Sequence, residues 1–202
     1  LPTYDRVNTH YFRRHIESRL RPLMPYFEAA ARRTGLDWKL LAAMAYQESH
    51  WRPEAVSATG VRGVMMLTQA TARELGVEDR EDPRESILAG AVYLVRMRNK
   101  IPARIEEPDR TWMALAAYNI GWGHLEDARV ITQRQGGDPD RWSDVKDRLP
   151  LLSDPEFYRD TRFGYARGRE PVRYVANSRS YSDILTWKAG RQQLGAMSMT
   201  GD

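Results

Sequence analysis

The sequence places one carboxylate where it could act as an acid. Asp37 is a suitable N-cap for a helix over residues 38–49. On that helix Leu41, Met44 and Glu48 lie within about 60° of one another, because each residue advances by about 100°. Glu48 therefore shares the apolar face, at the negative end of the helix dipole. Both conditions disfavour the ionised carboxylate and predict a raised pKa, as a general acid requires.

A structural role for Glu48 is equally compatible with this segment. A buried glutamate is also stable when Arg52, Ser49 or backbone groups satisfy its carboxylate. The helix alone does not decide between the two interpretations.

Three later stretches have residue types suited to binding a ligand. Residues 57–67 form a loop of small residues, which allows a ligand to approach the backbone closely. Residues 114–121 place Tyr118 and Asn119 at a predicted helix end. Residues 170–175 place Tyr174 near a helix start. Each stretch by itself also fits a structural role: a connecting loop, a glycine-terminated helix and an aromatic core position.

Other kinds of chemistry have no support in the sequence. The chain has no cysteine, and its four histidines form no i, i+4 pair and no His-Glu-x-x-His motif. No glycine pattern for binding nucleotide phosphates is present. We therefore expect neither a metal nor a cofactor.

Composition indicates a folded, mildly basic protein. The 202 residues include 31 Lys+Arg and 27 Asp+Glu, a formal net charge of +4. No long basic block or basic-aromatic stripe is present, so we expect no nucleic-acid partner. No apolar run approaches the ~18 residues of a membrane span. The start lacks the apolar core of a signal peptide, so we expect a mature form, a cytosolic protein or a piece of a longer chain.

The periodicity predicts an all-α fold with almost no strand signals. We expect one domain over residues 1–187, an irregular segment within it at 138–168, and a disordered tail at 188–202. Prolines 22 and 25 predict a bend between the first two helices, and the break at 121–123 leaves Trp122 as a candidate sugar platform. The expected helices span residues 11–20, 24–34, 38–49, 68–75, 83–100, 111–119, 125–135 and 171–187.

Together and in this order, the four stretches resemble the soluble-type (family 1) lytic transglycosylases of the goose-type-lysozyme-like superfamily. That family has a Glu-Ser pair ending a helix, then Gly-Leu-Met-Gln-Leu-Met-Pro, Ala-Tyr-Asn-x-Gly and Glu-Thr-x-x-Tyr-Val segments. The matching residues here are 48–49, 63–69, 117–121 and 170–175, and the resemblance covers about residues 29–183. Met66 replaces the family's groove-lining glutamine, Thr68-Gln69 replaces its Met-Pro and Pro171 replaces its threonine, which puts one substrate hydrogen bond in question.

The resemblance implies a lysozyme-like helical domain with a substrate groove. It implies that Glu48 protonates the bond between N-acetylmuramic acid and N-acetylglucosamine, then takes the proton of the muramoyl 6-hydroxyl, so that a 1,6-anhydro sugar forms. The residues implied to support the acid are Ser49, Ser57 and Tyr174. Those implied to bind substrate are Thr59, Met65, Met66, Tyr118, Asn119 and Glu170.

The details are most similar to the catalytic module of the membrane-bound lytic transglycosylase F family. That likeness implies an upstream periplasmic-binding-protein-like regulatory domain in the full-length protein. It also implies a place in the periplasm of a Gram-negative bacterium, attached to the outer membrane. The implied partners are peptidoglycan glycan strands and muropeptides.

Two alternative functions remain open. A hydrolytic lysozyme-type muramidase would use the same Glu48 with water as the nucleophile and would usually need a second carboxylate. Glu54 is near in sequence, but we expect it in an exposed loop after Pro53. A non-catalytic peptidoglycan-binding module is the other alternative, against which the intact Glu48-Ser49 pair argues.

Overall fold

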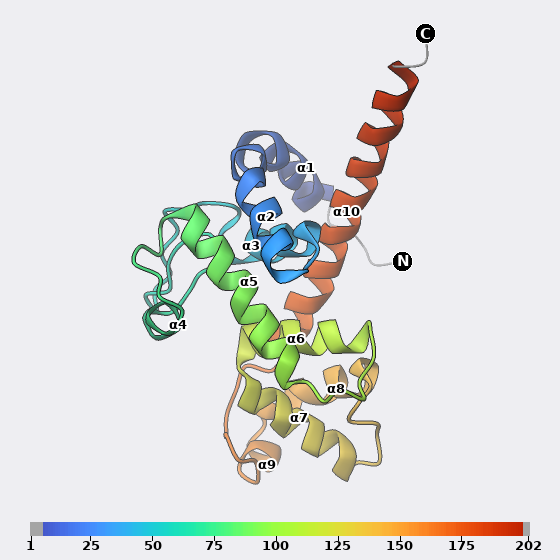
Figure 1. Cartoon of the computed structure of the whole chain (residues 1–202). Helices are drawn as coiled ribbons and strands as arrows, with labels where there is room; N and C mark the ends of the chain where they lie inside the picture. The colour runs from blue at the N-terminus through green and yellow to red at the C-terminus, as the bar shows by residue number, and fades with distance from the viewer. Residues whose placement is uncertain (1–5, 200–202) are drawn as a thin grey trace. The chain divides into compact units, whose positions relative to one another are not determined.

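The computed structural model describes residues 6–199, and side chains from residue 10 to residue 191. Over this range the chain is helical, with isolated β-bridges and no strand (Figure 1). The all-α prediction is confirmed. The elements are α1 (Arg6–His15), η1 (Ile16–Leu20), α2 (Arg21–Thr34), α3 (Trp38–Ser49), α4 (Gln69–Glu74), α5 (Pro83–Lys100), α6 (Asp109–Ile120), α7 (Trp122–Arg134), α8 (Trp142–Arg148), η2 (Leu149–Ser153), α9 (Pro155–Tyr158) and α10 (Arg169–Met199).

The chain divides into two compact units. The first comprises Leu1–Ala91 and Ser178–Asp202, and the second comprises Val92–Asn177. Helices α5 and α10 contribute residues to both units. That residues 1–187 form one domain stays a prediction.

An aromatic cluster forms part of the core of the first unit. The Phe12 ring lies 4.7 Å from the Tyr46 ring and 4.5 Å from the Tyr181 ring, measured between centroids. Tyr46 in turn lies 4.5 Å from Trp51. Because the four rings come from α1, α3, the loop after α3 and α10, their burial joins segments far apart in sequence.

The first two predicted helices differ from the structure at their junction. The chain is helical from α1 through η1 into α2, and η1 is a π-helical turn. Pro22 lies in the first turn of α2, directly after the π-helical turn, and Pro25 lies inside that helix. The predicted gap between the two helices at residues 21–23 is therefore wrong, and the bend stays a prediction. Gly35 ends α2 with φ 73°, as expected.

The second unit packs α6, α7, α8 and η2 around an apolar core. Its fully buried side chains include Met113, Leu115, Leu125, Val145 and Leu149. Gly121, with φ 97°, ends α6, and α7 begins directly at Trp122. The predicted break over residues 121–123 is therefore confined to Gly121.

Two other predictions from sequence need correction. The segment 138–168, predicted to be irregular with only short helical turns, contains α8, η2 and α9. The last helix does not end at Trp187 but continues to Met199, so a disordered tail is wrong for residues 188–199; residues 200–202 lie outside the described residues.

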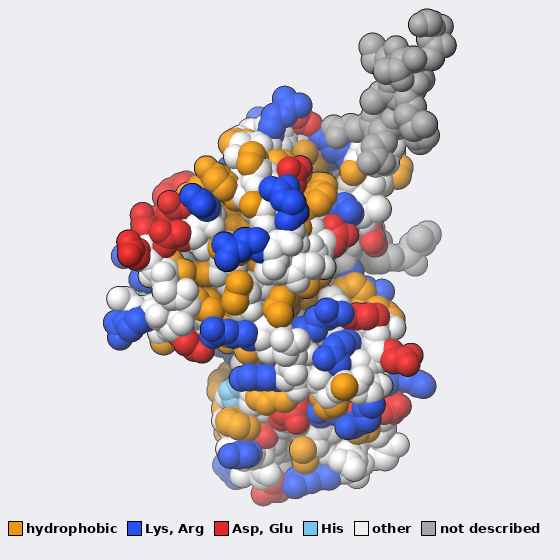
Figure 2. Space-filling model, viewed as in Figure 1, with side chains coloured by type: hydrophobic (Ala, Val, Ile, Leu, Met, Phe, Trp, Pro, Cys, Tyr) orange, Lys and Arg blue, Asp and Glu red, His pale blue; other side chains and the backbone are white. Residues whose placement is uncertain are grey.

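The surface mixes charges of both signs. On the face seen in Figure 2, basic and acidic side chains are interspersed. Within the described part of the chain, no helix combines the length and the apolar character needed to cross a bilayer.

Candidate active site

Helix α3 carries Glu48 in its last turn. Asp37 caps the start of the helix by accepting a hydrogen bond from the Lys39 backbone N–H at 2.9 Å, as predicted. Leu41 and Met44 are fully buried, and Glu48 is half-buried. Next to it, the Gln47 amide donates to the buried Ser178 hydroxyl at 2.7 Å. The end of α3 is thereby tied to α10 within the first unit.

Glu48 faces a cleft of about 440 Å³ in the first unit. The buried Leu41 and Met44 do not line the cleft, whereas Glu48, one turn further along α3, opens onto a space large enough for a ligand. This position favours the functional interpretation of Glu48 over a purely structural one. Its lining residues are Gln47, Glu48, Ser49, His50, Arg52, Glu54, Ala55, Val56 and Met66.

Ser49 ties the chain that follows α3 to the end of the helix. Its hydroxyl lies 2.8 Å from the Val64 carbonyl and 3.2 Å from the Ala45 carbonyl, and it accepts from the Arg52 N–H at 3.2 Å. With one proton to donate, the hydroxyl serves these backbone groups. Ser49 therefore orients the backbone beside Glu48, and its support of the acid stays a prediction.

We call residues 50–67 the cleft loop. It is closed by paired backbone hydrogen bonds between Arg62 and Leu67, at 3.2 Å and 3.0 Å. Arg80 reinforces it from outside, because its guanidinium donates to the carbonyls of Gly60 and Leu67 at 2.9 Å and 3.0 Å. The indole N–H of buried Trp51 donates to the Ala42 carbonyl at 2.8 Å. The loop is therefore held by its own backbone pairing, by Arg80 and, at Trp51 and Val64, by bonds to α3.

Backbone strain is concentrated where the cleft loop borders the cleft. Three residues other than glycine have positive φ: His50 at 52°, Trp51 at 56° and Met66 at 50°. Such a conformation is unfavourable for bulky side chains and persists only where the surrounding structure enforces it. His50 and Met66 both line the cleft, so the strained positions form part of its wall.

The other predicted residues of the loop have different surroundings. Met66 lines the cleft beside Glu48, as a groove residue should. Met65 is 1% exposed and packs against Gly90, so its side chain belongs to the core and not to a substrate-binding surface. Ser57 and Thr59 bond to each other at 2.9 Å, and the Ser57 hydroxyl also accepts from the Val61 N–H at 3.3 Å. These contacts stabilise the turn, and neither residue lines the cleft.

The remaining predicted residues belong to the second unit. Tyr118 packs between Tyr93, at 5.3 Å, and Tyr174, at 6.4 Å between ring centroids. Asn119 is exposed at the end of α6, whereas Tyr174 is only 6% exposed. Glu170 lies 3.6 Å from Arg167 in an exposed ion pair. Their roles beside Glu48 or on a sugar, and that of the half-buried Trp122, stay predictions.

Two histidines beside the cleft are held in the neutral form. Burial, followed by the nearby Arg19, lowers the pKa of His15, whose Nδ1 lies 3.0 Å from the Tyr46 hydroxyl. Burial and then Arg52 lower the pKa of His50. Burial also raises the pKa of Tyr46 to about 12. These rings thus add no charge near Glu48 at neutral pH.

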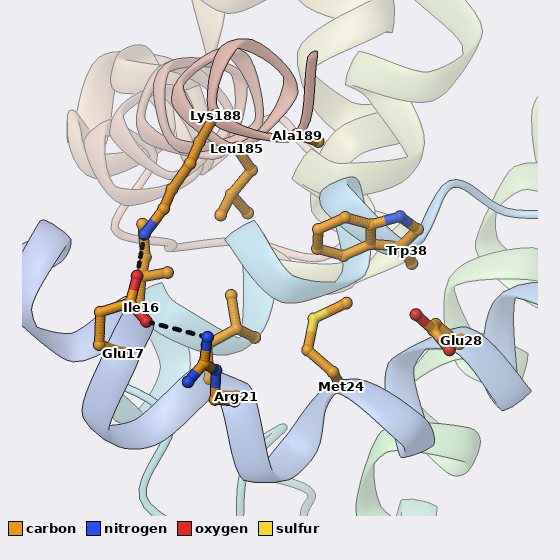
Figure 3. Close-up of a pocket in the computed structure, with 10 residues that line it drawn as sticks. Ile16, Glu17, Arg21, Met24, Glu28, Trp38, Leu185, Lys188 and Ala189 are labelled. Atoms are coloured by element: carbon orange, nitrogen blue, oxygen red, sulfur yellow. Dashed lines mark hydrogen bonds and ion pairs between the residues drawn. The ribbon is translucent and has the colours of Figure 1, made fainter. Parts of the chain in front are cut away.

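A second cavity in the first unit, of about 490 Å³, is less suited to acid catalysis (Figure 3). Ile16, Leu185 and Trp38 give it a largely apolar lining. Its Glu17 carboxylate is bound by Lys188 and lies 3.7 Å from Arg21. The hydrogen bond from Lys188 lowers the pKa of Glu17, the opposite of what a general acid needs.

Sequence reasoning considered two charged residues, Arg52 and Glu54, but did not place them in a substrate cleft. Glu54 is exposed as expected, yet it lines the same cleft as Glu48, and Arg52 lines it too. Neither follows a helical or strand period, because the turn through His50 and Trp51 alone brings them back to the end of α3. Among the described residues, no group of three or more His, Cys, Asp or Glu could hold a metal ion.

Comparison with known proteins places these features in a family. The family model for the transglycosylase SLT domain matches residues 25–140. This range includes α3, the cleft loop and Glu48. The chain belongs to the transglycosylase SLT domain family.

Curated relatives of this family are similar over most of the chain. A protein of Alcanivorax borkumensis is 58% identical over 176 residues, which are 87% of this chain and 38% of the relative. One from Idiomarina loihiensis is 58% identical over 185 residues, 91% of this chain and 40% of the relative. Both are named membrane-bound lytic murein transglycosylase F. The chain thus spans about two fifths of the length of these relatives.

Proposed function

We propose that this chain is a peptidoglycan lytic transglycosylase module that uses Glu48 as its acid and then as its base. The observation that carries the proposal is the position of Glu48 in the last turn of α3, lining the cleft within the matched part of the family. The names of the relatives support the same activity. The substrate is the β-1,4 bond between N-acetylmuramic acid and N-acetylglucosamine.

The proposed reaction uses one carboxyl group twice. Glu48, protonated, gives its proton to the glycosidic oxygen as the bond to C1 of muramic acid breaks. The 2-acetamido group supports the positive charge that develops at C1. The Glu48 carboxylate then takes the proton of the muramoyl 6-hydroxyl while that oxygen attacks C1. Atoms balance without water, and the product is a 1,6-anhydromuramoyl sugar.

The surroundings of Glu48 fit such a role. The half-buried position reduces hydration of the carboxylate, and the carbonyl end of α3 disfavours its ionised form. The Ser49 hydroxyl holds the Val64 carbonyl against the helix end, which keeps the cleft wall in place. Met66 supplies an apolar part of the wall where a glutamine would offer a hydrogen bond.

One observation favours a second candidate, a hydrolytic muramidase. Glu54 lines the same cleft as Glu48, so a second carboxylate is present that could activate water. A hydrolase would leave a reducing-end muramic acid, and it would depend on Glu54 as well as on Glu48. The transglycosylase needs Glu48 alone.

The wider setting is also proposed from the relatives. Because they are more than twice as long as the matched region, we propose that an upstream regulatory domain similar to periplasmic-binding proteins precedes this module in the full-length protein. Their names as membrane-bound proteins support a place in the periplasm of a Gram-negative bacterium, attached to the outer membrane. Glycan strands and muropeptides would be its partners there.

Digestion of purified peptidoglycan tests the activity. We expect mass spectrometry to show muropeptides one water lighter than lysozyme products, with the parent chain and with Glu54→Gln, and none with Glu48→Gln. Reducing-end products that disappear in Glu54→Gln would favour the hydrolase. No release by the parent, with binding retained, would indicate a peptidoglycan-binding module.

A further inference from the structure

We propose that Arg52 is an anion-recognition residue of the Glu48 cleft, which binds the carboxylate carried on the lactyl side of a muramoyl residue. This inference rests on the proposed function and adds to it a way to distinguish muramoyl glycans from neutral glycans. It is carried by the position of Arg52, the direction of its bonds and the charges around it.

The backbone and Nε of Arg52 are hydrogen-bonded, whereas the terminal nitrogens of its guanidinium stay open to a ligand. Its backbone N–H donates to Ser49, and its Nε donates to the Ser49 carbonyl at 3.2 Å. The side chain is thus anchored at the C-terminal end of α3. The residue is exposed and lines the cleft, and no carboxylate forms an ion pair with it among the residues that the structure describes. The two terminal nitrogens of the guanidinium remain available for a ligand.

The available nitrogens suit a carboxylate. A guanidinium presents paired N–H donors whose spacing matches the two oxygens of a carboxylate. N-acetylmuramic acid differs from N-acetylglucosamine by a lactyl group, which ends in a carboxylate on bare glycan. On peptide-bearing glycan the lactyl group is amidated, and the stem peptide supplies carboxylates instead. Both sources offer the same chemistry to Arg52, whereas a chitin oligosaccharide offers none.

Other charged groups in the cleft set limits on where the anion can bind. Glu54 lines the same cleft, and its negative charge opposes an anionic ligand. His50 is held neutral by burial and by Arg52 itself, which lowers its pKa, so it does not compete as a cation. Glu48 carries no charge while it acts as an acid. Arg52 is therefore the attractive charge of the cleft lining and Glu54 the repulsive one.

Binding measurements in a Glu48→Gln background test the inference without turnover. The probes are a chitin oligosaccharide, a peptide-free N-acetylglucosamine–N-acetylmuramic acid fragment and the same fragment with its stem peptide. We expect Arg52→Gln to weaken binding of the anionic probes about five- to tenfold, and to leave the neutral probe unchanged. Arg52→Lys, which keeps the charge without the paired donors, restores part of the affinity. Glu54→Gln strengthens binding of the anionic probes.

Arg73→Gln is the matched control, because Arg73 is an exposed arginine of α4 that does not line the cleft. A loss confined to the peptide-bearing probe assigns the carboxylate to the stem peptide, and a loss on the peptide-free probe assigns it to the lactyl group. Equal weakening of neutral and anionic probes, or no weakening in Arg52→Gln, overturns the inference alone. A Glu48→Gln chain that binds none of the three probes contradicts the proposed function as well.

Discussion

The cleft loop and the segment 138–168 both depart from regular long helices, but different interactions hold them. In the cleft loop, Ser49 and Arg80 bind backbone carbonyls, Trp51 donates to a carbonyl of α3, and bulky residues adopt positive φ. In the second unit, charged side chains with little exposure hold the segment 138–168 in place. The Asp127 carboxylate accepts the N–H groups of Arg162 and Phe163 at 3.1 Å and 2.9 Å.

Ion pairs complete the second arrangement. The Arg129 side chain is 8% exposed and bonds Glu126 at 2.6 Å and Asp140 at 2.7 Å. Strain that faces a cleft is typical of functional sites, whereas a satisfied charge network without unusual backbone is typical of a structural element. The comparison agrees with the proposed binding role of the cleft loop and favours a structural role for the segment 138–168.

The largest expected effect is that of Glu48→Gln, which should lower activity without lowering stability. Glu48→Gln should lower the rate of anhydromuropeptide release at least about 100-fold, because the proton donor is lost. The melting temperature should change by less than about 3 °C, since the residue is half-buried and the amide has nearly the same shape. Rates from mass-spectrometric assays, together with thermal unfolding, check both. Activity close to that of the parent would remove Glu48 from the mechanism.

Gly63→Ala tests the backbone of the cleft loop. An added Cβ would lie 1.8 Å from the Arg80 carbonyl oxygen, at a residue with φ 84°. We expect a loss of about 3–5 kcal/mol in the free energy of unfolding, from overpacking and backbone strain together. Gly76→Ala is the control, because Gly76 has φ 73° but no atom near the added Cβ; strain alone should cost about 1–2 kcal/mol. Equal losses in urea unfolding would mean that the loop can move away.

Arg129→Met tests the charge network of the second unit. It leaves Glu126 without its partner and removes one of the two arginines bound to Asp140, which keeps Arg104. We expect a loss of about 3 kcal/mol in the free energy of unfolding. The rate per folded molecule should stay within about twofold of the parent, because the network does not line the cleft. A loss of activity that exceeds the unfolded fraction would contradict the assignment of segment 138–168 to stability.

The smallest effect is a difference in pH dependence. Because the pKa values of His15 and His50 are lowered in the folded protein, the unfolded chain binds more protons than the folded one below about pH 6.5. The first unit should therefore lose stability as the pH falls from about 6.5. The hydrogen bond from Arg104 lowers the pKa of Asp140, so its contribution is lost only below about pH 4. Urea unfolding of His15→Gln at pH 5.5 and 7.5 should show a smaller pH slope than the parent. An unchanged slope would mean that His15 does not titrate in this range.

Local signals in the sequence predicted much of the fold. The Asp37 N-cap, the helix starts expected at residues 68 and 83 and the helix end expected at residue 34 occur within one residue of their expected places, because they depend on neighbouring residues. The helical face predicted for Glu48 also holds. Predictions fail where packing overrides local preference, as at Pro25 inside α2 and Trp122 at the start of α7.

The sequence by itself determined the helical class, the position of Glu48 at the end of α3 and the motif order of the family, since each depends on residues close together in the chain. Only the tertiary structure decided that Met65 is core while Met66 lines the cleft, and that Arg52 and Glu54 share the cleft with Glu48. The reason is physical: the positive φ values of His50 and Trp51 reverse the chain, and bonds from Ser49, Trp51 and Arg80 hold it reversed. Such contacts link residues whose spacing in sequence carries no period.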